Sequence, residues 1–259
     1  MSRPYSRSAI ALSGGFLLAA LSACGSSSPS NVGADAGTDA GSRDVGSTPQ
    51  DGGTTADGGN ASAAVSGLVS LNDSPIANAT VAVVGGAVAS ATTGADGTFS
   101  FSLPVGSTQL LRATLAGARA SQSSLVVPAE GVTNFKLVLI RAADLTAAYS
   151  ALSLTEDTTK GIFLLHFRVA GVAGSTQPGG FGATLSVTGG TRFGVSDSGP
   201  MRQETTSVGD DSLAIANVPV GNVTVIPVLP SGHTCMPRYG LSFFRVDAQT
   251  ITEAFFDCT

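Results

Sequence analysis

Tryptophan is absent from this chain, histidine occurs only twice, and charged residues make up 12% of the 259 residues. Lys and Arg number 13 against 18 Asp and Glu, so the formal net charge is −5. Nucleic-acid binding and electrostatic docking on anionic lipid headgroups both need a basic surface. The composition therefore argues against both, and the lack of tryptophan argues against a carbohydrate platform built from exposed aromatic rings.

Sequence motifs of common enzymes are also missing. The chain has no G-x-S-x-G nucleophile elbow, no H-E-x-x-H zinc helix and no G-K-[ST] phosphate loop. His166 alternates with core-type Phe and Leu residues, so we expect it on an outer sheet face or rim rather than as a general base. Asp210 and Asp211 are flanked by Gly and Ser and are expected to form a solvated loop. We therefore expect a noncatalytic protein with no cofactor and no metal ion.

The N-terminus has the features of an export signal. Arg3 and Arg7 precede an apolar run over residues 10–20, which is typical of a secretory signal and is too short and too interrupted to span a membrane. The run ends in Leu21-Ser22-Ala23-Cys24, which resembles the lipobox of bacterial lipoproteins. That resemblance implies cleavage of the signal peptide 1–23, a diacylglycerol on the Cys24 thiol, and a further acyl chain such as palmitate on the new amino group. An ordinary cleaved signal with a chance cysteine is the alternative.

A lipidated Cys24 would hold the protein on a membrane, because two or more acyl chains anchor stably. We expect the cell envelope and, since Gly25 is not the aspartate of the usual inner-membrane retention signal, the outer membrane. The protein would face either the periplasm or the cell surface. Residues 24–62 are almost all Gly, Ala, Ser, Thr and Asp and are expected to form a disordered linker with a reach of about 35 Å.

From residue 63 the pattern becomes that of an all-β protein. Short alternating apolar runs are separated by turn residues, and Phe99, Phe101 and Leu103 share one face directly after an Asp96-Gly97 turn. About seven such runs over residues 63–141 predict a small antiparallel β-sandwich.

The same segment resembles a known family. The residues that carry the resemblance are Gly67-Leu68-Val69, Pro75-Ile76-Ala77-Asn78-Ala79-Thr80-Val81, Thr93-Gly94-Ala95-Asp96-Gly97-Thr98-Phe99-Ser100-Phe101 and Leu103-Pro104-Val105-Gly106. They are similar to the carboxypeptidase regulatory-like domain, although Gly117-Ala118 departs from the family's glycine–aromatic pair. The resemblance implies a transthyretin-like sandwich of seven strands that has no catalytic residues of its own.

Residues 160–258, within the second predicted domain at 142–259, repeat this order loosely. Ala183–Gly190 parallels Ala79–Gly86, and Leu213–Gly221 parallels Phe99–Gly106. We therefore predict a second, divergent sandwich with a longer loop near Gly199–Ser212; an unrelated β domain with common turn chemistry is the alternative.

The two cysteines left after Cys24 form an even pair. Cys235 and Cys258 lie in the second predicted domain of an exported chain, so we predict a structural disulfide. The alternative is a reactive or metal-binding pair with His233, which offers too few ligands for zinc.

These features predict a membrane-anchored envelope lipoprotein that acts as a noncatalytic binding or spacer module. Its partner, a protein or a glycan, would bind at the sandwich loops, with Gly199–Ser212 as the first candidate. One alternative is a subunit of an envelope or surface assembly. A less favoured one is a hydrolase with a site around Asp197, Asp210, Asp211 and His233.

Overall fold

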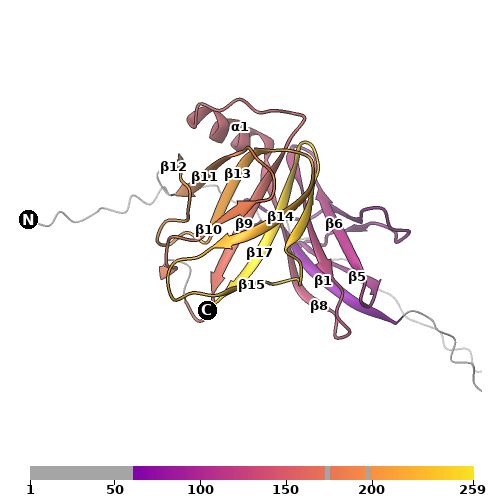
Figure 1. Ribbon diagram of the computed structural model, residues 1–259. Coiled ribbons are helices and arrows are strands. Elements are labelled where there is room, and N and C mark those ends of the chain that lie inside the picture. Colours follow the sequence, from indigo (N-terminus) through magenta and orange to yellow (C-terminus); the bar gives the residue numbers. More distant parts are fainter. Residues whose placement is uncertain (1–60, 173–175, 197–198) are drawn as a thin grey trace, which may run out of the picture. The chain divides into compact units, whose positions relative to one another are not determined.

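The computed structural model describes residues 61–172, 176–196 and 199–259. The predicted signal peptide, Cys24 and all but the last two residues of the predicted linker lie outside this part of the chain. As predicted, the described residues are mostly β-strand, with one short α-helix (Figure 1). None of the described helices is long and apolar enough to cross a membrane.

The first half contains eight strands. The strands are β1 (Ser62–Leu71), β2 (Ser74–Pro75), β3 (Thr80–Val83), β4 (Ala91–Thr92), β5 (Thr98–Pro104), β6 (Thr108–Thr114), β7 (Ala118–Val126) and β8 (Val132–Arg141). The predicted face of β5 is correct, because Phe99, Phe101 and Leu103 are all buried in one core. The turn before β5 also forms, with Gly97 in the left-handed region at φ +77° and Asp96 accepting the Thr98 N–H.

Helix α1 (Ala142–Ala151) follows β8 and leads to the strands of the second half. The remaining strands are β9 (Gly161–Val169), β10 (Gly182–Leu185), β11 (Thr191–Ser196), β12 (Gly199–Arg202), β13 (Ser212–Val218), β14 (Gly221–Val228), β15 (Cys235–Pro237), β16 (Phe243–Val246) and β17 (Thr250–Cys258). A second core is built from the inward faces of these strands, including Phe163, Leu165 and Phe167 of β9.

The same pairing scheme occurs in both halves. β1 pairs antiparallel with β5 and parallel with β8, and β9 pairs antiparallel with β13 and parallel with β17. Likewise β6 joins β3 to β7, and β14 joins β10 to β16, in antiparallel ladders. Parallel pairs were not part of the prediction; β1–β8 and β9–β17 each place the last strand of a half beside its first.

The two halves share a sheet. The first residues of β17 pair in parallel with β7, Thr250 opposite Ala120 and Thr252 opposite Gln122, while the whole of β17 from Ile251 pairs with β9. The continuous order is β12-β11-β13-β9-β17-β7-β6-β3-β4. One face of the β13-β9-β17 part covers the second core, and the opposite face packs partly against α1 through Leu145 and Tyr149.

Candidate functional site

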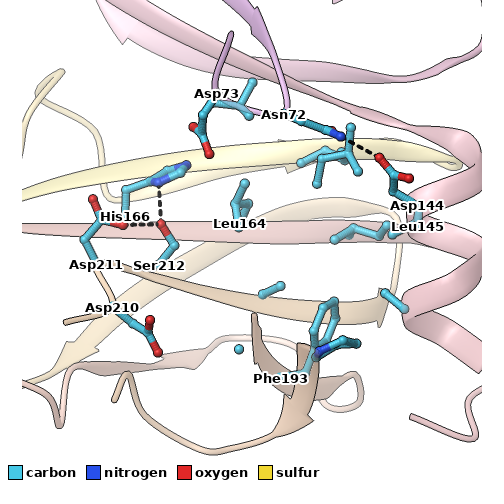
Figure 2. A pocket seen from close by; sticks show the side chains of 18 of the residues that line it. Asn72, Asp73, Asp144, Leu145, Leu164, His166, Phe193, Asp210, Asp211 and Ser212 are labelled. Carbon is cyan, nitrogen blue, oxygen red and sulfur yellow. Dashed lines mark hydrogen bonds between the residues drawn. The ribbon is translucent and has the colours of Figure 1, made fainter. Parts of the chain in front are cut away.

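A pocket of about 700 Å³ lies on the face of β9, β13 and β17 that points away from the second core (Figure 2). The alternation along β9 explains its position, since Phe163, Leu165 and Phe167 enter the core and the intervening side chains face the pocket. The apolar residues that line it are Val138, Ile140, Leu145, Ala147, Ala148, Ala151, Ile162, Leu164, Phe193, Pro200, Ala214 and Ile251. Side chains from β8, α1 and the second half therefore build one floor.

Carboxylates dominate the polar rim of the pocket. Asp73 is paired with Lys136 at 3.6 Å, and Asp144 accepts a hydrogen bond from Asn72. Asp210 and Asp211 also line the pocket, and among the described residues no Lys, Arg or His nitrogen lies within 4.0 Å of either carboxylate. The rim thus holds more negative than positive side chains.

One wall of the pocket contains a chain of hydrogen-bonded side chains from three neighbouring strands. Ser212 on β13 and His166 on β9 are cross-strand partners, and their Oγ and Nδ1 atoms are 2.9 Å apart. His166 Nε2 lies 3.2 Å from Oε2 of Glu253 on β17, whose side chain is fully buried. The Ser212 hydroxyl also lies 2.8 Å from Asp211 Oδ1 (Figure 2). Serine, imidazole and a buried carboxylate in this order can activate a hydroxyl group.

The segment that leads from α1 to β9 is fixed by polar contacts. Asp157 accepts hydrogen bonds from the Thr159 hydroxyl and N–H and pairs with Lys160, which lowers the pKa of its carboxyl to about 2. Burial, together with the nearby Glu156 carboxylate, raises the pKa of Tyr149 to about 12. Asn217 accepts from the Asp157 N–H and donates to the Thr155 carbonyl, so β13 holds the end of this segment.

The structure confirms the predicted disulfide between Cys235 and Cys258. The two cysteines are directly opposite each other on β15 and β17, and Cys258 is buried in the second core. Among the described residues no three His, Cys, Asp or Glu side chains are grouped so that they could hold a metal ion.

The other predicted site residues are only partly brought together. Gly199–Ser212 does border the pocket through Pro200 and Gly209–Ser212, but its first four residues are strand β12 rather than loop. His233 is absent from the pocket lining; it packs against Phe181 and lies 3.1 Å from the Thr259 carbonyl. Asp197 lies outside the described residues.

His166 takes a more specific place than an outer-face rim residue. It does point away from the core, as expected, but its side chain is only 15% exposed and has a partner on each ring nitrogen. Its ring also stacks on Phe255, with centroids 4.4 Å apart. Sequence reasoning missed Glu253 and Ser212; the one available signal was a carboxylate inside the apolar run Ile251-Thr252-Glu253-Ala254-Phe255-Phe256.

Comparisons with known proteins show the kind of domain in the first half. Among curated proteins none matches the chain. Similar solved structures include the Bacillus anthracis TIE protein (10% identity, TM-score 0.24), a streptococcal ancillary pilin (10%, 0.25) and the shaft pilin SpaA from Lactobacillus rhamnosus GG (12%, 0.27). Each covers 76% of this chain, which spans 34%, 63% and 98% of the three, respectively. Residues 64–140 match the family model of the carboxypeptidase regulatory-like domain, so the resemblance stated for this segment is confirmed.

Proposed function

We propose that this protein is a lipid-anchored envelope protein whose folded part binds a ligand in the pocket between α1 and the β13-β9-β17 sheet. The single observation behind the proposal is a concave site with an apolar floor and a small number of polar groups at its rim, which is the usual form of a ligand site. Anchoring rests on the lipobox resemblance at Cys24, and binding rests on the pocket. The second half is proposed to be a divergent copy of the first, because the strands of both halves pair by the same scheme.

The lining defines the chemistry of the ligand. The floor is apolar over β9, β13 and α1, so it would cover an aliphatic or aromatic body. The carboxylates of Asp210 and Asp211 have no cationic partner among the described residues, whereas Asp73 already has Lys136. A ligand with an apolar body and one positive charge would fit both features, while an anion would be repelled.

Binding is tested with a matched pair of probes, hexyltrimethylammonium and hexanoate, titrated by calorimetry into the full chain purified in detergent. The cation should bind and the anion should bind at least about tenfold more weakly, from the charge of the rim. Asp210→Asn combined with Asp211→Asn should weaken cation binding about tenfold, and Glu130→Gln, an exposed carboxylate away from the pocket, should not.

The floor is tested separately on α1. Ala148→Phe places a ring in the pocket and should abolish binding, whereas Thr146→Phe adds the same ring at an exposed position that does not line the pocket and should leave binding unchanged. Equal affinity for both probes, or binding that survives Ala148→Phe, would refute the pocket as the binding site.

Anchoring has its own experiment. Cys24→Ala should release the chain from the membrane fraction or leave the signal peptide uncleaved, and intact mass spectrometry should show the loss of the acyl chains. An unchanged mass and unchanged fractionation would contradict a lipid anchor. Shaving intact cells with a broad-specificity protease, beside a periplasmic control protein, would then tell whether the folded part faces the medium or the periplasm.

A second function, as a subunit of an envelope or surface assembly, is favoured by one surface. Ile226 and Val228 of β14 are 60% and 46% exposed, and Phe243 of β16 is 52% exposed on the same face, opposite Thr224. Neighbouring exposed apolar side chains of this kind mark protein contacts. Chemical crosslinking in cells should capture a protein partner with the unchanged protein and lose it with Ile226→Lys. The same crosslinked product from both proteins would remove the support that this surface gives to the assembly function.

A further inference from the structure

We propose that Ser212 is an activated nucleophile that accepts an acyl group, with His166 as its general base and Glu253 as the carboxylate that positions the base. This goes beyond the ligand binding proposed above. It rests on the hydrogen-bonded side chains in the wall of the pocket, and it holds or fails independently of the cationic ligand.

The three side chains lie on three adjacent strands, β13, β9 and β17, and face the pocket side of the sheet. Ser212 and His166 are direct cross-strand partners, with Oγ and Nδ1 2.9 Å apart. Glu253 pairs with Leu164, two residues before His166 on the same face, and its Oε2 is 3.2 Å from His166 Nε2. These distances meet the geometric criterion for a nucleophile, its base and a third group that orients the base.

The surroundings of Glu253 determine which imidazole nitrogen carries the proton. Its Oε1 accepts hydrogen bonds from the Val138 N–H at 2.6 Å and from the Ser121 hydroxyl. Oε2 is then left as the acceptor for a proton on His166 Nε2, which leaves the lone pair of Nδ1 directed at Ser212. Stacking on Phe255, at an interplanar angle of 7°, holds the ring in this orientation.

Asp211 competes with the base for the same proton. The Ser212 hydroxyl has one hydrogen and two acceptors, His166 Nδ1 at 2.9 Å and Asp211 Oδ1 at 2.8 Å. In the conformer that donates to Asp211, the oxygen is not activated by the imidazole. Removing the Asp211 carboxylate should therefore make Ser212 more reactive, a result that a purely structural network would not give.

The reaction is a transfer of an acyl group from an ester. The Ser212 Oγ–carbonyl carbon bond forms while His166 Nδ1 takes the hydroxyl proton, and the proton then goes to the alkoxy oxygen as its bond to the carbonyl carbon breaks. Water can then attack the acyl–Ser212 ester with His166 as its general base, and the proton passes to the Ser212 oxygen as the carboxylic acid is released. Leu164 and Ala214 are neighbours of His166 and Ser212 on the same face, so the acyl group should be apolar. The acidic rim favours neutral or cationic esters over anionic ones.

The test uses an alkyl fluorophosphonate on the full chain purified in detergent, with the labelled residue located by peptide mass spectrometry. A Ser Oγ–P bond forms, fluoride leaves, and the serine proton passes to His166. Ser212 should be labelled in the unchanged protein and Ser212→Ala should not be labelled. Ser102→Ala, which removes an exposed hydroxyl that is hydrogen-bonded to Ser62, is the matched control and should label normally.

Three further variants separate chemistry from folding. His166→Ala should lower the labelling rate at least about 100-fold, and added imidazole should restore part of it. Asp211→Ala should raise the rate, and Glu253→Gln should lower it and shift its pH profile, provided that circular dichroism shows an intact fold. No label at Ser212, labels spread over exposed serines, or a rate unchanged in His166→Ala would overturn the proposal.

Discussion

Reduction of the Cys235–Cys258 disulfide should lower the free energy of unfolding by about 3 kcal/mol. The bond joins residues that are 23 positions apart. In the chain-entropy model, closing a loop of this length lowers the conformational entropy of the unfolded chain by about 11 cal/mol/K. At 25 °C this entropy corresponds to about 3 kcal/mol. The two cysteines are direct partners on β15 and β17, so the folded strands need not move to form the bond.

The assay is urea unfolding of the same protein with and without a phosphine reductant. With a slope of about 2.5 kcal/mol/M, the midpoint should fall by about 1.2 M. The comparison keeps both sulfur atoms, so it isolates the cross-link. Cys235→Ala combined with Cys258→Ala should cost about 1 kcal/mol more, because the buried Cys258 side chain is then truncated in the core. A midpoint unchanged by reduction would refute the entropic argument for this loop.

Three other predictions concern packing and pH. Gly67→Ala should destabilise the first half by about 3 kcal/mol, because a Cβ there would lie 2.1 Å from the Phe135 carbonyl oxygen and 2.6 Å from the Phe99 ring. Urea unfolding measures the loss of stability. A loss no larger than that caused by Ser66→Ala would contradict the prediction. The stability that Tyr149 contributes should be complete below pH 10 and lost as the pH rises to about 12, because the fold raises the pKa of this side chain from 10.0. In an absorbance titration, Tyr149→Phe should lack the tyrosine transition near pH 12. If that transition persists, its assignment to Tyr149 is wrong. Asp157 should stabilise the fold above pH 3.8 and lose that effect as the pH falls to about 2. The free energy of unfolding of Asp157→Asn should therefore fall less steeply with decreasing pH over this interval. An unchanged pH dependence would count against the hydrogen bonds between Asp157 and Thr159.

Local pattern was enough to predict much of the first half. The alternation in Thr98–Leu103 and the Asp96-Gly97 turn depend on neighbouring residues only, and both form as expected. The disulfide was predicted by counting cysteines in a chain expected to be exported, and it forms. The parallel β7–β17 pair did not follow from any local signal, because it joins Ala120–Gln122 to Thr250–Thr252 across most of the folded chain.

The candidate site shows the same limit more sharply. Ser212 and His166 are separated by 46 residues, and Glu253 lies 87 residues after His166. A sequence motif with fixed spacing cannot identify three residues that come together only because their strands pair in the fold. The alternative hydrolase site, which grouped Asp210 and Asp211 with His233, was based on residue type alone. In the fold, the histidine that lines the pocket with these two aspartates is His166 and not His233.

The way in which the chain enters the fold has a mechanical consequence. Strand β1 starts at Ser62, immediately after the segment that leads back to Cys24, and it is hydrogen-bonded along both edges, to β5 and to β8. Tension applied through that segment acts along the strand, across the perpendicular ladder bonds to β5 and the slanted ones to β8. These bonds are then loaded together in shear instead of being opened one after another. A protein tethered at this point would resist pulling much better than one tethered through a terminal edge strand such as β4.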